Sequence, residues 1–149
     1  MPLETGKTAP DFKLPDSHGT HHTLDDLLKN GPLVLFFYPK DDSPGCTKQA
    51  CSFRDSYERL SGQGITVAGI SRDGVASHLA FQEKYELPFL LLSDAGGSVH
   101  KDYRTSVLGL MTRRITYLID SDKTIKLVFE QNLKMGSHVD AVLEFMQAE

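Results

Sequence analysis

The chain has 149 residues, of which 40% are hydrophobic and 24% are charged, and these values are typical of one globular domain rather than a disordered chain. Its net charge of −4 argues against a general nucleic-acid or anionic-membrane surface. The longest apolar runs hold about six residues, far short of the roughly 20 that span a bilayer. We therefore expect a single domain over residues 1–149, without a nucleic-acid or membrane partner.

Residues 1–7 contain no apolar segment like that of a signal peptide, so we expect a cytoplasmic protein. A transit peptide removed ahead of this start is the alternative. The chain holds two cysteines, Cys46 and Cys51, which are too few for a disulfide-rich scaffold. In a reducing compartment, a pair this close in sequence is typical of a catalytic or redox-sensing site.

The first elements predicted along the chain are a hairpin, a short helix and two strands. Residues 13–22 alternate loosely around a Ser-His-Gly turn, which predicts a small N-terminal hairpin. Residues 23–26, Thr-Leu-Asp-Asp, have the pattern of a capped helix start. Residues 33–38 and 65–70 are nearly continuous apolar runs, typical of strands that are covered on both faces.

A helical pattern lies between these two strands. An apolar stripe at helical spacing predicts a helix over residues 46–60 and places Cys46 on the core side of its first turn. The stripe consists of Cys46, Ala50, Phe53, Tyr57 and Leu60. A strand, a helix and a strand in this order predict a βαβ unit with parallel strands.

The second half of the chain predicts further alternation of helices and strands. The expected elements are a helix at 75–85, a strand at 89–92, a short helix at 98–103, strands at 115–119 and 125–129, and a last helix from a capping box at 137–140. Periodicity alone therefore predicts an α/β sandwich. Gly96 and Gly97 lack the spacing of a phosphate-binding loop.

Cys46 stands at the junction between the strand at 33–38 and the following helix. Unpaired backbone N–H groups and the helix dipole favour an anion at such a junction. They therefore favour the thiolate, which is the reactive form of cysteine. Because Pro, Ser, Pro and Gly cluster on the approach to Cys46, we interpret it as a nucleophile rather than as a small core residue.

The spacing of the two cysteines has a mechanical consequence. Residues five apart on an ideal helix have Cα atoms roughly 8.5 Å apart. A disulfide needs a Cα separation below about 7 Å. Cys46 and Cys51 can therefore join only if the first turns of their helix unwind.

Residues 37–51, Phe-Tyr-Pro-Lys-Asp-Asp-Ser-Pro-Gly-Cys-Thr-Lys-Gln-Ala-Cys, resemble the peroxiredoxins, and most of all the peroxiredoxin Q, or bacterioferritin comigratory protein, branch. Residues 6–12 and 87–94 also resemble this branch, so that the likeness covers nearly the whole chain. The resemblance implies a thioredoxin-like fold of the peroxiredoxin type. In that fold, helices flank a central mixed β-sheet.

The resemblance assigns five site residues. Pro39, Ser43 and Cys46 take the places of the family's proline, hydroxyl residue and peroxidatic cysteine. Cys51 takes the place of the resolving cysteine, and Arg114, at the start of Arg-Ile-Thr-Tyr, that of the active-site arginine. Ser43 departs from the family, which more often has threonine there, and it lacks the methyl group that restricts the threonine rotamers.

The implied function is a thiol peroxidase that reduces hydrogen peroxide and organic hydroperoxides. Cys46 would become a sulfenic acid, Cys51 would condense with it to form an intramolecular disulfide, and thioredoxin or a similar dithiol donor would reduce that disulfide. Arg114 would stabilise the developing charge, Ser43 would hydrogen-bond to the peroxide and the thiolate, and Pro39 would shape the loop and shield the sulfur. We expect a monomer.

Other interpretations compete with this one. Without the resemblance, Arg114 could equally be a surface arginine, Ser43 a turn cap and Pro39 a strand terminator. A disulfide oxidoreductase would more often have Cys-x-x-Cys, and a redox sensor would use Cys46 without turnover. A zinc site would need a second ligand cluster, and the histidines at 18, 21 and 22 lie on a polar turn, so we expect neither a metal nor another cofactor.

Overall fold

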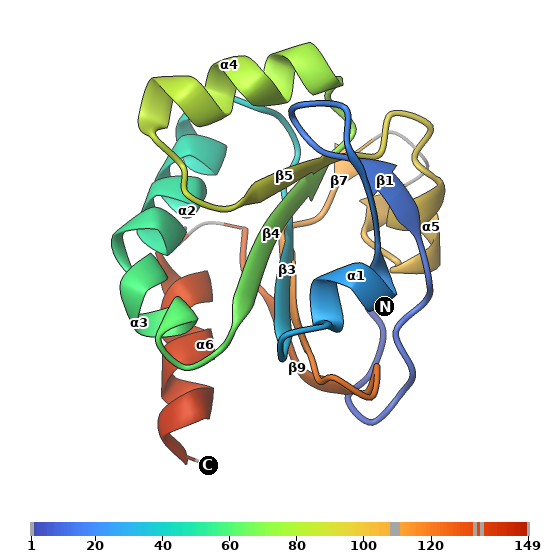
Figure 1. Cartoon of the computed structure of the whole chain (residues 1–149), viewed down its shortest axis with the longest axis vertical. Coiled ribbons are helices and arrows are strands. Elements are labelled where there is room, and N and C mark those ends of the chain that lie inside the picture. Colours follow the sequence, from blue (N-terminus) through green and yellow to red (C-terminus); the bar gives the residue numbers. More distant parts are fainter. Residues whose placement is uncertain (1, 108–110, 133, 135, 149) are drawn as a thin grey trace.

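The computed structural model describes residues 2–107, 111–132, 134 and 136–148, and its centre is a mixed five-stranded sheet (Figure 1). The strand order is β5-β4-β3-β8-β9. These strands are β3 (Leu33–Phe37), β4 (Thr66–Ser71), β5 (Leu90–Ser93), β8 (Ile115–Ile119) and β9 (Ile125–Glu130). Strands β3, β4 and β5 are parallel, whereas β8 runs antiparallel to both β3 and β9.

Helices cover both faces of the sheet (Figure 1). One face packs against α2 (Pro44–Asp55), α3 (Tyr57–Ser61), α4 (Val75–Tyr85) and α6 (Ser137–Ala148). The other face packs against α1 (Leu24–Leu28), α5 (Ser98–Asp102) and the hairpin of β1 (Lys13–Pro15) and β2 (His21–Thr23). The predicted mixed sheet with flanking helices and an N-terminal hairpin is thus confirmed.

Strand β3 is the centre of the core because each of its faces meets a different helical layer. Leu33, Leu35 and Phe37 belong to the hydrophobic cluster on the α1 and α5 side. Val34 and Phe36 belong to the cluster on the α2 side, where the Phe36 ring stacks on Phe53 with centroids 4.6 Å apart. All five residues of the strand are buried, which explains its continuous apolar sequence.

The sheet topology brings two distant segments to one edge. Because β3 and β8 are antiparallel, with Phe36 opposite Thr116, the chain leaves β3 beside the point where it enters β8. Cys46 follows β3 and Arg114 precedes β8, so both lie at this edge. The carboxyl ends of β4 and β5 meet there too, since these strands are parallel to β3.

Three features differ from the sequence-based expectations. The helix predicted over residues 46–60 begins at Pro44 and is interrupted at Ser56, whose φ of −103° and ψ of 5° lie outside the helical range. Within α2 the Ser52 hydroxyl donates to the Gln49 carbonyl at 2.7 Å, a bond that competes with the helical ladder and bends helices. Strands β6 (Ser106–Val107) and β7 (Met111–Thr112) form a small antiparallel pair that the sequence pattern did not predict.

The third difference concerns the last helix, where the expected capping box is wrong. Ser137 lies inside α6, and its hydroxyl donates to the Lys134 carbonyl at 2.5 Å instead of accepting from Asp140. The Asp140 N–H instead points at the Gly136 carbonyl, at 3.5 Å. Within the described ranges, no helix has the length and apolar character needed to cross a membrane.

Candidate active site

Cys46 lies in the first turn of α2, on the face that packs against the sheet. Pro44, the first residue of the helix, has no N–H, and the first helical bond runs from the Thr47 N–H to the Ser43 carbonyl at 2.8 Å. The N–H groups of Gly45 and Cys46 precede this bond and lie at the positive end of the helix dipole. Cys46 is only 1% exposed, as its predicted place in the apolar stripe requires.

The Arg114 side chain reaches Cys46 from the opposite segment. Its Nη1 donates to the Cys46 Sγ at 3.0 Å, which joins residues 68 positions apart. Among the described residues, no carboxylate lies within 4.0 Å of the Arg114 guanidinium. The positive charge of Arg114 is therefore directed at the sulfur.

Gln49 is a third member of this group, and the sequence analysis did not identify it. It lies one helical turn after Cys46, is fully buried, and accepts a hydrogen bond from Arg114 Nη1 at 3.2 Å through Oε1. Its Nε2 is buried without a partner in the described part of the chain. The sequence did contain a signal for Gln49, because it is a polar residue three positions after Cys46 on the buried side of the predicted helix.

The backbone of Arg114 is held by the end of β9. Its N–H donates to Asn132 Oδ1 at 3.1 Å, and its carbonyl accepts from the Gln131 N–H at 3.2 Å. The preceding residue, Arg113, makes a bidentate ion pair with Glu130, at 2.7 and 2.6 Å. Neighbouring residues near a strand point to opposite faces, so these two arginines serve different sites.

A buried polar network holds the loop that leads to Cys46. Asp41 accepts from the Tyr38 hydroxyl at 2.6 Å and from the Ser77 hydroxyl at 2.8 Å, and it contacts His78 Nδ1 at 2.7 Å. The other ring nitrogen of His78 donates to the Leu92 carbonyl at 2.9 Å. Burial, followed by the Asp41 charge, raises the pKa of Tyr38 well above its usual value, so that Tyr38 stays a donor.

Two further contacts attach the same loop to its surroundings. The Asp41 N–H donates to Asp73 Oδ2 at 2.7 Å. Asp42, in the left-handed region at φ 56°, accepts from Lys84 Nζ at 2.8 Å and from the Tyr85 hydroxyl at 2.7 Å. Two adjacent residues of the loop, Asp41 and Asp42, therefore connect it to α4. No sequence pattern pointed to these long-range bonds.

The structure gives less direct support to the predicted roles of Ser43 and Pro39. The Ser43 hydroxyl donates to the Lys40 carbonyl at 2.9 Å and makes no capping bond to α2. Ser43 would have to rotate before it could donate to a peroxide or to Cys46. Pro39 is exposed two residues after the end of β3, and its shielding role stays a prediction.

Cys51 lies apart from the Arg114 group although it shares α2 with Cys46. Both cysteines are free thiols in the structure. Cys51 is half-buried and lines a groove of about 600 Å³ between α2 and the start of α6. Burial raises the pKa of its thiol, with a further contribution from Asp55 that Arg54 opposes. A raised pKa lowers the fraction of Cys51 that is thiolate at neutral pH.

His138 supports the strand that carries Arg114. Its Nε2 donates to the Gln131 carbonyl at 2.8 Å, so that in the neutral ring Nδ1 accepts from the Thr116 hydroxyl at 2.8 Å. Burial lowers the pKa of His138, and the nearby Arg114 charge adds to this effect, while the bond to Gln131 opposes it. The uncharged ring therefore braces β8 two residues beyond Arg114.

Comparisons with known proteins identify the family of the chain. The model of the AhpC/TSA family matches residues 5–128. Chloroplastic peroxiredoxin Q of Arabidopsis thaliana is 45% identical over 148 residues, which cover 98% of this chain and 68% of that protein. The structure of peroxidoxin BcpB from Mycobacterium tuberculosis is 39% identical, with a TM-score of 0.93 over 98% of this chain and 97% of that chain.

A third relative is the bacterioferritin comigratory protein of Xanthomonas campestris, whose structures are described in connection with its alkyl peroxide reduction activity. It is 30% identical, with a TM-score of 0.86 over 98% of this chain and 96% of that chain. The chain thus belongs to the AhpC/TSA family, the thiol peroxidases with a peroxiredoxin-type thioredoxin fold. Within that family it falls in the peroxiredoxin Q, or bacterioferritin comigratory protein, branch.

The pKa of His138 predicts a pH dependence of stability. Because the folded pKa lies below the unfolded value of about 6.5, the unfolded chain takes up the proton first as pH falls. Stability should be unaffected above that pH and should decline below it, until the folded pKa is reached. Urea denaturation at pH 7.5 and pH 5.5 should show a smaller decline in His138→Gln, whose amide can still bond to Thr116 and Gln131. Equal declines in both proteins would contradict the assignment.

Proposed function

We propose that the protein reduces peroxides through Cys46, resolves the product with Cys51 in the same chain, and is recycled by thioredoxin or a similar dithiol donor. The observation that carries this proposal is the 3.0 Å contact between Arg114 Nη1 and the buried Cys46 Sγ at the start of α2. It combines a nucleophile, a fixed positive charge and a helix N-terminus. The proposed substrates are hydrogen peroxide and organic hydroperoxides, the latter in line with the activity named for the Xanthomonas relative.

In the first step, the Cys46 thiolate attacks one oxygen of the peroxide and the O–O bond breaks. The sulfur is oxidised to a sulfenic acid, and the leaving oxygen departs as hydroxide or alkoxide, which takes a proton to become water or an alcohol. Negative charge moves from the sulfur to the leaving oxygen during this step. The guanidinium of Arg114, with several donors on one rigid plane, can follow that charge because Gln49 bonds to it and Asn132 holds the Arg114 backbone.

In the second step, the Cys51 thiol condenses with the sulfenic acid, which releases water and forms the disulfide. Both cysteines lie within α2, five residues apart, so that the Cα separation of about 8.5 Å on a helix is too long for this bond. The first turns of α2 must therefore unwind. Cys46 then leaves Arg114 and moves toward the groove that Cys51 lines.

The polar network around Asp41 sets where this unwinding begins. The loop over residues 38–43 is attached to α4 through His78, Lys84 and Tyr85. These hydrogen bonds are charge-assisted, and the one between Asp41 and His78 is also buried, so that they resist opening more than the first turn of a helix does. We therefore place the hinge at the Ser43–Pro44 junction, directly after the anchored loop.

A dithiol donor then reduces the disulfide by thiol–disulfide exchange, which returns both cysteines to the thiol form and oxidises the donor. Such a cycle needs a reducing compartment, and we propose a cytoplasmic location on this ground. Cys46, Gln49, Arg114 and Cys51 all belong to one chain, so the cycle can run in a monomer. The half-exposed position of Cys51 gives a donor thiolate access to the resolving sulfur.

The proposal is tested by peroxide consumption coupled to thioredoxin, with wild type compared with Cys46→Ser. Turnover in the wild type separates an enzyme from a sensor that reacts once. We expect Cys46→Ser to lose essentially all turnover, because serine is not a nucleophile toward peroxide at neutral pH. Retention of more than a few per cent of the activity would exclude Cys46 as the peroxidatic residue.

Arg114→Ala should slow the oxidation of Cys46 by about 10²-fold or more, since one preorganised charged donor is lost. The matched control is Arg113→Ala, which removes the adjacent arginine on the opposite face and should leave the rate within a few-fold of wild type. Stopped-flow measurement of the reaction with hydrogen peroxide gives both rates. Similar rates for the two variants would show that Arg114 acts only through the overall charge.

Peroxide should convert the wild type to a Cys46–Cys51 disulfide within one chain, seen as the loss of two hydrogens by intact mass. Amide exchange should accelerate over residues 47–54, while residues 38–42 stay protected by the Asp41 network. Cys51→Ser should stop at the sulfenic acid and overoxidise at higher peroxide. Full thioredoxin-driven turnover in Cys51→Ser would remove its resolving role, and unchanged exchange in the oxidised protein would refute the unwinding step.

A further inference from the structure

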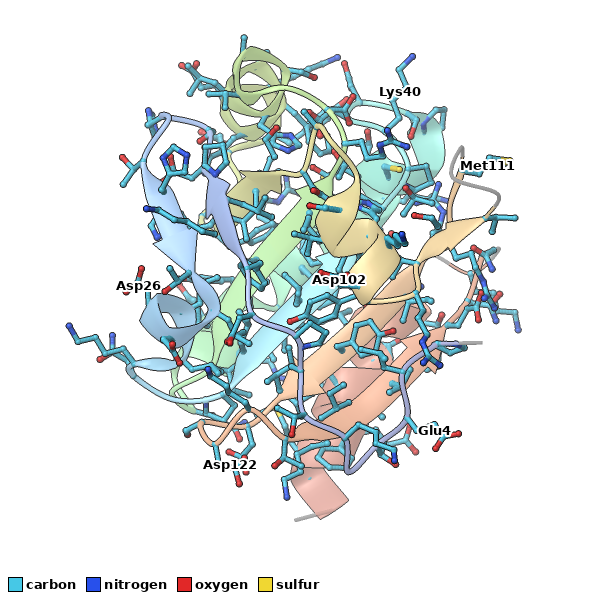
Figure 2. The ribbon with its side chains drawn as sticks, turned by 90° about the vertical axis from the view of Figure 1, so that its right-hand side faces the viewer. Glu4, Asp26, Lys40, Asp102, Met111 and Asp122 are labelled. Carbon is cyan, nitrogen blue, oxygen red and sulfur yellow. The ribbon has the colours of Figure 1, made fainter. Side chains whose placement is uncertain are left out.

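A second cavity, of about 650 Å³, lies on the α5 side of the molecule, the side that Figure 2 turns toward the viewer. Four cationic side chains line it: Arg72, Lys101, Arg104 and Arg113. None of the residues that line it is acidic. On a chain with a net charge of −4, a cavity whose charged lining residues are all cationic departs from the average charge of the surface.

The charges of this cavity are only partly balanced by the protein. Arg113 is neutralised by its bidentate pair with Glu130. Lys101 and Arg104 are exposed, and neither has an ion pair with any residue in the described ranges. Like charges around one concave surface repel each other, and an anion bound between them relieves this repulsion.

The position of the cavity in the fold also suits a ligand. Arg72 follows β4, and Gly96 and Gly97 follow β5, so the cavity lies at the carboxyl ends of two adjacent parallel strands. In open α/β sheets, ligand-binding crevices lie outside the carboxyl ends of the strands. The cavity is separate from the Cys46 group, which lies among the residues packed against α2 on the other face.

The two glycines shape this wall of the cavity. Gly97 has a φ of +78°, and a Cβ at this position would lie 3.0 Å from Arg72 Cζ. The absence of a side chain therefore lets the Arg72 guanidinium pack directly against the backbone. A Cβ at Gly96 would meet no atom within 4 Å, so the wall of the cavity is open at this position. Two glycines that match no phosphate-loop pattern in the sequence thus line a cationic cavity in the fold.

We propose that this cavity binds a small ligand that carries phosphate groups. Arginine forks match the oxygens of phosphate in a bidentate manner, and Arg104 presents such a fork to the cavity without an ion pair to any described residue. A phosphate ester or diphosphate carries two or more negative charges, which the two cations without ion pairs, Lys101 and Arg104, can balance together. The volume exceeds that of a single inorganic phosphate, so the ligand includes a diphosphate or an organic part.

The test is isothermal titration of pyrophosphate and of ADP into the wild type at low, constant ionic strength. The double variant Lys101→Gln/Arg104→Gln should bind both ligands at least about tenfold more weakly, because charge-assisted hydrogen bonds are lost. The control Lys29→Gln/Arg59→Gln removes two exposed cations outside the cavity and has the same net charge. It should bind like the wild type. Arg104→Lys, which keeps the charge but loses the fork, should fall between the two.

Three results would overturn the proposal. Absence of binding by the wild type at millimolar ligand would exclude the site. Equal weakening in the two double variants would mean that overall charge, and not the cavity, attracts the anion. Equal affinity for succinate would show a general dianion site without preference for phosphate. Circular dichroism of each variant establishes that it is folded, which is expected because all four replaced side chains are exposed.

Discussion

The contact between the Arg114 guanidinium and the Cys46 sulfur is the interaction on which the active site depends. It joins two segments 68 residues apart, and it exists because β3 and β8 are antiparallel neighbours in the sheet. The end of β9 fixes the Arg114 backbone, His138 braces the strand behind it, and Gln49 holds the guanidinium from α2. Each of these groups constrains the direction of one positive charge, and the chemistry of the thiolate follows from that direction.

Helix α2 has two opposing roles in the proposed cycle. While α2 is folded, its first turn directs Cys46 at Arg114, and when it unwinds, Cys46 can reach Cys51. A helix of 12 residues is marginal in isolation, so the packing of Ala50 and Phe53 against the sheet provides much of its stability. The break at Ser56 separates this helix from α3, which limits how far unwinding needs to spread.

Most helices and strands could be predicted from the sequence, because the buried face of each one consists of apolar residues at a regular spacing. The continuous apolar run before Cys46 became β3, and the stripe through Ala50, Phe53 and Leu60 became the buried face of α2 and α3. The helix was predicted as continuous because nothing in the stripe shows that Ser52 bonds back to Gln49. Gln49 was overlooked for a related reason, since its partner Arg114 lies 65 residues away.

By itself, the sequence determined the place of Cys46 at a strand-to-helix junction and the conflict between cysteine spacing and helix geometry, and it predicted Cys46 as the nucleophile, because all three depend on residues close together in the chain. The tertiary structure alone decided which side chains meet across the sheet edge: Arg114 with Cys46, His78 with Asp41, and the cations around the α5 cavity. These contacts depend on strand order and register, and a one-residue shift in register would turn each side chain to the opposite face.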